Sequence, residues 1–229
     1  MTSTNQTSAI DIGALPVPLG KRTLLRLEEA EPATIGHFRE HGFVHRGIQP
    51  VNAVARTSGT AVTVKAHGLD GAVLHYALGR LRPGDFLVVD RAGDDAIACI
   101  GGASALAASM RGAVGIIVDG CVTDIQELRE IGIPIWARGL SARTTRSEGL
   151  RGAFCIPVEC GGVTVQPGDA ILADENGILV LPPDEIEDTV SRAVSMQEQE
   201  KSTLARLRKG ETYPDVLGTT FKTQTCTPL

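Results

Sequence analysis

The stretch Gly101–Glu127 reads GGASALAASMRGAVGIIVDGCVTDIQE, and its pattern decides the fold. A glycine pair precedes a run of small residues, which predicts a helix whose first N–H groups point outward without partners. The apolar run 114–118 follows and predicts a buried strand. That strand ends in a turn bearing Asp119 and Asp124. This order predicts an α/β fold in which an anion-binding helix end faces a carboxylate that holds a cation.

The same pattern also has a purely structural interpretation. An acidic residue in the first turn of a helix is an ordinary capping arrangement, because it neutralises the positive end of the helix dipole. Taken alone, the stretch therefore leaves both the functional and the structural interpretation open.

Segments on both sides of this stretch extend the α/β pattern. Apolar runs predict buried strands at 86–90, 96–100 and 133–136. Residues 51–66 alternate with Ser and Thr around Ser58-Gly59, which predicts two strands joined by a hairpin. Residues 161–181 predict two or three further strands.

The two ends of the chain differ from this middle part. Residues 1–20 are polar and then proline-punctuated, which predicts an N-terminal arm. Pro182-Pro183-Asp184 opens a predicted long helix that runs to about Lys209, followed by a tail. We therefore divide the chain into an arm (1–20), a core (21–182) and a C-terminal helix with its tail (183–229).

Composition excludes several classes of function. The chain has 229 residues, a net charge of -5 and 3% aromatic residues, so it offers neither a basic surface nor stacking platforms for nucleic acid. No apolar run approaches the ~18 residues of a membrane span. The five cysteines form no framework of close pairs, which favours a reducing, cytoplasmic compartment. We expect a cytoplasmic protein with no nucleic-acid or membrane partner.

Four segments in fixed order resemble the RraA-like family, which includes metal-dependent 4-hydroxy-4-methyl-2-oxoglutarate aldolases and regulators of ribonuclease E activity. The resemblance covers roughly residues 20–210 and is carried by these segments: PGDFLVVD, GGASALAASMRGAVGIIVDGCVTDIQEL, IGIPIWARGLSARTTRSEG and IPVECGGVTVQPGDAILADENGILVLP. It implies a swivelling β/β/α-type fold assembled as a trimer or hexamer with sites between subunits. We expect the long C-terminal helix to make oligomer contacts.

The resemblance also implies roles for residues of the central stretch. Asp124 matches the aspartate that holds Mg²⁺ or Mn²⁺ partly through water, with Asp119 and Glu127 as possible supports of those waters. The aldolases carry arginine where this chain has Thr123 and an acid where it has Gly102. The arginine role therefore does not carry over. We expect a small anionic substrate to bind to the backbone N–H groups of Gly101, Gly102, Ala103 and Ser104. Arg143 or Arg146 is expected to supply the positive charge in place of the missing arginine.

Three functions follow from these observations. The first is a metal-dependent carbon–carbon lyase of the class II pyruvate aldolase type, an aldolase or decarboxylase acting on a small 2-oxo acid, with Asp124 and Thr123 at its centre. The second is a non-catalytic ring that binds a protein partner, as the ribonuclease regulators do. The third keeps the scaffold and the metal but performs divergent chemistry, such as decarboxylation or hydration.

Overall fold

A mixed β-sheet forms the centre of the molecule. The computed structural model describes residues 10–146 and 151–219, and within them ten strands form one sheet and two form a separate hairpin. The middle of the sheet is parallel, in the order β3 (Thr57–Lys65), β4 (Asp85–Asp90), β6 (Gly115–Val122) and β7 (Ile135–Leu140). The other strands are β1 (Ile10–Ile12), β2 (Gln49–Pro50), β5 (Ala98–Ile100), β8 (Gly152–Phe154), β9 (Val158–Cys160), β10 (Val163–Val165), β11 (Ala170–Ala173) and β12 (Ile178–Leu181).

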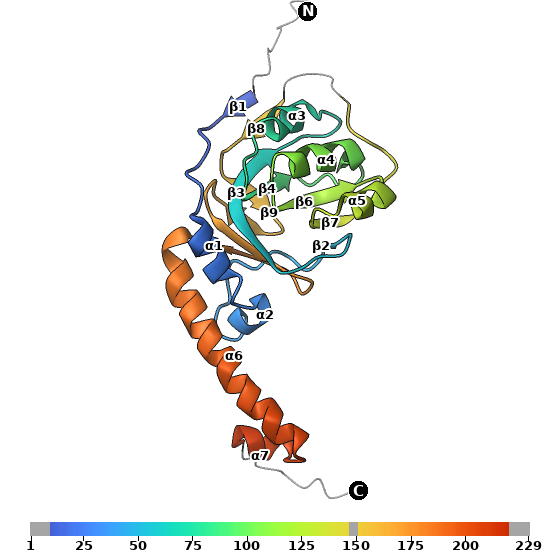
Figure 1. Cartoon of the computed structure of the whole chain (residues 1–229). Helices are drawn as coiled ribbons and strands as arrows, with labels where there is room; N and C mark the ends of the chain where they lie inside the picture. Colours follow the sequence, from blue (N-terminus) through green and yellow to red (C-terminus); the bar gives the residue numbers. More distant parts are fainter. Residues whose placement is uncertain (1–9, 147–150, 220–229) are drawn as a thin grey trace, which may run out of the picture.

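Alternating side chains of the parallel strands enter two separate cores, so both sheet faces are covered. On one face, Leu87 and Ile116 pack under helices α3 (Ala72–Leu78), α4 (Gly102–Met110) and α5 (Ile125–Ile131). On the other face, their neighbours Phe86 and Ile117 pack against residues of the β9–β10 hairpin and of β11–β12. Helices α3, α4 and α5 therefore lie together on one side of the sheet, as Figure 1 shows. The predicted β/β/α arrangement is confirmed.

A third core joins the two ends of the chain. The outer face of β11–β12 packs against α1 (Lys21–Leu27), α2 (Pro32–Ile35) and the start of α6 (Ile186–Arg208), which follows the short turn Pro183–Glu185. The buried residues of α6 in this core are Ile186, Val190 and Ala193. Beyond them the helix leaves the body and carries α7 (Tyr213–Leu217) at its far end (Figure 1). The predicted long helix is therefore present, and its first half packs against α1, α2 and β11–β12 of the same chain.

The hairpin predicted at Ser58-Gly59 is wrong. Residues 57–65 form one continuous strand, β3, and residues 51–55 form no strand. Gly59 serves a close packing contact instead of a turn, because a Cβ at this position would lie 2.7 Å from Val114 Cγ2 and 3.1 Å from Phe86 Cβ. The alternation of Ser and Thr with Val reflects a strand buried on both faces.

The described part of the N-terminal arm joins the sheet. Residues 10–12 form β1, which pairs in parallel with β8. On its other side, β8 pairs with β3. The described residues contain no helix that is both long enough and apolar enough to cross a bilayer.

Candidate functional site

The candidate site is built where the N-terminus of α4 meets the turn between β6 and α5. The backbone N–H of Gly102 donates a hydrogen bond of 3.0 Å to Asp124 Oδ2. Asp124 adopts the left-handed conformation (φ 55°), which aspartate tolerates better than most residues, and this conformation turns the chain from β6 into α5. The carboxylate is thus fixed against the positive end of the α4 dipole.

Close packing explains why glycine precedes α4. A Cβ on Gly101 would lie 2.4 Å from Asp124 Oδ2 and 2.9 Å from Thr123 Cγ2. The N–H of Gly101 donates to the hydroxyl of Ser104 at 2.8 Å, and this hydroxyl donates to the Gly101 carbonyl. Glycine therefore lets the carboxylate approach the helix end, and Ser104 holds that end in shape.

Two backbone donors remain available at this helix end. Gly101 and Gly102 use their N–H groups within the protein, as described above. The N–H groups of Ala103 and Ser104 donate to no acceptor among residues 10–146 and 151–219. Such groups at the start of a helix bind anions, because they are unpaired donors at the positive end of the dipole.

A cavity of about 690 Å³ opens from this point and runs between α3 and α4. Five residues expected to act in catalysis or substrate binding line it: Gly101, Ala103, Ser104, Thr123 and Asp124. Gly102 lies behind them and contributes the hydrogen bond to Asp124. The structure therefore brings the predicted helix end and the predicted carboxylate into one pocket.

Other predicted residues lie elsewhere. Neither Arg143 nor Arg146 lines the cavity, whose wall is formed by the two threonines between them. Asp119 pairs with Arg138 and accepts the N–H of Gly161 at 2.6 Å, so it belongs to a separate, smaller cavity. Glu127 lies beside the start of α4, where a Cβ on Gly102 would be 3.0 Å from Glu127 Cβ.

The acids around Asp124 limit the kind of metal that fits. The described residues contain no group of three or more His, Cys, Asp or Glu side chains placed to hold an ion. Asp124 is solvent-exposed, and its Oδ1 has only a long contact of 3.3 Å from the Thr123 hydroxyl. One free carboxylate oxygen fits Mg²⁺ or Mn²⁺, which keep several waters, and does not fit an ion that needs an all-protein cage.

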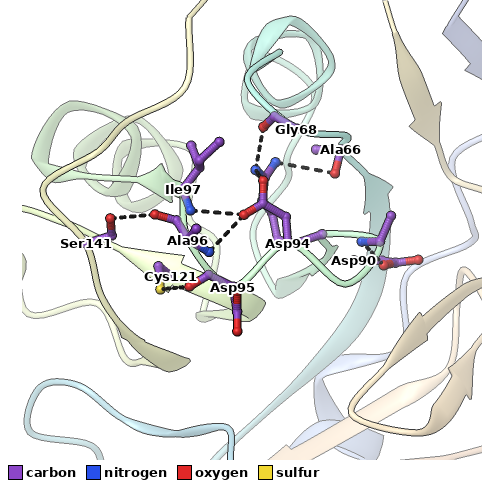
Figure 2. Close-up of polar contacts among 11 residues, drawn as sticks. Ala66, Gly68, Asp90, Asp94, Asp95, Ala96, Ile97, Cys121 and Ser141 are labelled. Atoms are coloured by element: carbon purple, nitrogen blue, oxygen red, sulfur yellow. Dashed lines mark hydrogen bonds and ion pairs between the residues drawn. The ribbon is translucent and has the colours of Figure 1, made fainter.

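A polar network supports the floor of the cavity. Figure 2 shows the loop between β4 and β5, in which Asp94 Oδ1 accepts the N–H groups of Ala96 and Ile97 at 2.9 and 3.0 Å. The hydroxyl of Ser141 donates to the Ala96 carbonyl at 2.7 Å. The fully buried Arg91, at the start of this loop, donates to the Gly68 carbonyl at 2.6 Å. These bonds position β5 and tie it to residues 141–145, and both segments line the cavity.

Several residues that line the cavity are not among those predicted from the sequence. Arg111 and Cys99 are two of them. Arg111 follows Ser104 by seven positions on the α4 face that also presents Ala107, so helical periodicity would have revealed it. Burial raises the pKa of the Cys99 thiol to about 12, which keeps it neutral and excludes a thiolate role.

The fold and the pocket define an α/β protein in which the unpaired N–H groups at the start of α4 lie beside the carboxylate of Asp124. The sequence profile of the RraA-like family, described as Aldolase/RraA, matches residues 28–180. The chain therefore belongs to the RraA-like family.

Individual relatives carry two kinds of name. A Halalkalibacterium halodurans protein that is provisionally named 4-hydroxy-4-methyl-2-oxoglutarate aldolase is 31% identical over 155 residues, which are 68% of this chain and 73% of that protein. The Thermus thermophilus protein named as this aldolase is 36% identical over 128 residues, which are 56% of this chain and 77% of that protein. The structure of the RNA-processing inhibitor RraA from Thermus thermophilus matches with a TM-score of 0.59 and 32% identity. The match covers 64% of this chain and 88% of that one.

Proposed function

We propose that this protein is a divalent-metal-dependent carbon–carbon lyase that acts on a 2-oxo acid. The observation that carries this proposal is the hydrogen bond between Gly102 N–H and Asp124 Oδ2, which holds a carboxylate beside the unpaired N–H groups of Ala103 and Ser104. A metal ligand and an anion receptor thus share one wall of the pocket. The aldolase names of relatives support the same reaction class.

Each group of the site has a distinct role in this proposal. The N–H groups of Ala103 and Ser104 receive the substrate carboxylate and thereby orient the adjacent 2-oxo group toward Asp124. Oδ1 of Asp124 is the oxygen that would hold Mg²⁺ or Mn²⁺, because Oδ2 is occupied by Gly102. When bound there, such an ion would polarise the 2-oxo group and stabilise negative charge on its oxygen.

Thr123 makes this site atypical. Its hydroxyl is a neutral donor at the position where the resemblance to aldolases implies an arginine, and it lies 3.3 Å from Asp124 Oδ1. A bidentate arginine at a developing enolate is worth about 3 kcal/mol or more, which a hydroxyl does not supply. Arg111 does not replace it, because Arg111 is at the opposite end of α4. We therefore expect slow cleavage of short pyruvate-type substrates.

The test is release of pyruvate from oxaloacetate and from 4-hydroxy-4-methyl-2-oxoglutarate, measured by a coupled assay with Mg²⁺ and with chelator. We expect low turnover that disappears with chelator and in Asp124→Asn, while Glu130→Gln, an exposed acid on the same helix α5, keeps it. Chelator-resistant turnover would overturn the metal assignment. A protein that shows no turnover at all, even with an arginine at position 123, would support the partner-binding function carried by the inhibitor name of the structural relative.

A further inference from the structure

The cavity is longer than a short 2-oxo acid requires. It extends from the Asp124 end along the α4 face formed by Ser104, Ala107 and Arg111. Its volume of about 690 Å³ lies in the range of pockets that bury ligands of drug size. A pyruvate unit held at Ala103 and Ser104 therefore fills only one end.

The wall between the two ends is largely apolar. Leu74 and Leu78 of α3, Ala107 of α4, Ile100 and the neutral thiol of Cys99 line it, together with the polar side chains of His75, Thr144 and Thr145. An aliphatic chain gains free energy when it leaves water for such a surface, at about 0.8 kcal/mol per buried methylene. The middle of the cavity thus suits methylene groups better than hydroxyl or charged groups.

An exposed cation, Arg111, lines the cavity at the C-terminal end of α4. Arg111 Nε donates to the Leu81 carbonyl at 3.0 Å, which fixes the guanidinium at the C-terminal end of α4. Among the residues that the structure describes, no carboxylate pairs with Arg111. Its terminal nitrogens are always protonated and form a fork that matches a carboxylate.

The separation of the two ends sets the length of the ligand. Ser104 and the C-cap residue Arg111 are seven positions apart, which separates their Cα atoms by about 10 Å at about 1.5 Å per residue. An extended chain advances about 1.2 Å per bond, as backbone dimensions show, so about eight bonds cover this span. A five-carbon diacid is too short to reach both ends.

We infer that the pocket takes an extended 2-oxo dicarboxylate of about eight carbons, with its 2-oxo acid end at Asp124 and its second carboxylate on Arg111. This inference rests on the proposed function, because the same site holds the 2-oxo acid end. It makes Arg111 the residue that determines specificity for the second carboxylate.

Calorimetric binding in the presence of Mg²⁺ tests the inference with three probes: 2-oxosuberate, its matched monoacid 2-oxooctanoate, and the short diacid 2-oxoglutarate. We expect native protein to bind 2-oxosuberate at least about tenfold more tightly than either of the other two probes. This is the gain in affinity expected from one charge-assisted hydrogen-bonded pair between Arg111 and the second carboxylate. In Arg111→Gln this preference should disappear while the affinity for 2-oxooctanoate stays within about threefold. Arg111→Lys should restore part of the preference, because it keeps the charge and loses the fork.

A second measurement needs no variant and so does not depend on folding of Arg111→Gln. The methyl ester of the distal carboxylate of 2-oxosuberate should bind native protein as weakly as 2-oxooctanoate does. Equal affinities of native protein for 2-oxosuberate and 2-oxooctanoate, or equal losses for both in Arg111→Gln, would overturn the inference and leave the proposed function intact. Failure of all 2-oxo acids to bind native protein, or full affinity for them in Asp124→Asn, would overturn the proposed function itself.

Discussion

Asp124 Oδ2 accepts the backbone N–H of Gly102 at 3.0 Å, and this bond joins the turn after β6 to the first residue of α4. The two elements are far apart in sequence, yet this contact sets where the carboxylate lies relative to the unpaired N–H groups of the helix. The geometry of the site therefore depends on the close approach of these two residues.

Gly101→Ala should disturb this approach directly. Its Cβ would lie 2.4 Å from Asp124 Oδ2, so the carboxylate must move away from the helix end. We expect the affinity for Mn²⁺ in the presence of oxalate, a mimic of the pyruvate enolate, to fall about 10- to 100-fold, because a small misplacement of a group in an active site has an effect of this size. Gly139→Ala is the matched control, because a Cβ there meets no atom within 4 Å. Equal affinities of both variants and native protein would show that Asp124 is not held by this contact.

Thr123→Arg should restore the missing charge. We expect decarboxylation of oxaloacetate with Mg²⁺ to rise by a factor of about 10 or more, which corresponds to about 1.4 kcal/mol of transition-state stabilisation. Thr123→Gln, long but neutral, is the control and should give no gain. Adding Gly102→Asp tests the second departure, although its Cβ is tight against Glu127 Cβ at 3.0 Å. Strong native turnover, or equal rates of the Gln and Arg variants, would contradict this prediction.

The central part of the site followed from the sequence because its signals are local. The glycine pair, the apolar run and the acid after it predict α4, β6 and α5, and the structure contains all three. Glycine by itself does not distinguish a turn from a close packing contact, so the hairpin predicted at Ser58-Gly59 is absent and Gly59 lies within β3.

Pairings between distant residues were not visible in the sequence. Asp119 was predicted in the turn with Asp124, but β6 continues to Val122, so Asp119 lies inside the strand, where Arg138 on the neighbouring strand β7 pairs with it. Arg143 and Arg146 are in the expected loop, yet the strand-like pairing of Ala98 with Thr144 brings the threonines to the cavity. Only the fold shows which side chains of a polar loop face the site.

The buried thiol of Cys99 predicts a loss of stability at high pH. Burial raises the pKa of Cys99 from its ordinary value of 9.0 to about 12. Below pH 9 the thiol is neutral in both states, and above it only the unfolded chain ionises. The free energy of unfolding should therefore fall between about pH 9 and 12, with this group contributing up to about 1.4 kcal/mol per pH unit. Urea unfolding of Cys99→Ala should show a shallower pH slope; an unchanged slope would contradict the assignment.

The protein should be an oligomer, with a trimer or a pair of trimers expected. Two apolar side chains of α4 near the site are exposed, Leu106 by 50% and Met110 by 79%, and the second half of α6 leaves the body. Light scattering at micromolar concentration should give a mass three or six times that of one chain. A mass near 24.1 kDa would rule out a site completed by a neighbouring subunit.

Binding of Mn²⁺ by Asp124 is the most direct test of the proposed lyase. Calorimetric titration should show Mn²⁺ binding to native protein, at least about tenfold weaker binding to Asp124→Asn, and native-like affinity in Glu130→Gln. Circular dichroism should show that all three proteins are folded. Unchanged Mn²⁺ affinity in folded Asp124→Asn would contradict the assignment of this carboxylate as the metal ligand and, with it, the proposed lyase mechanism.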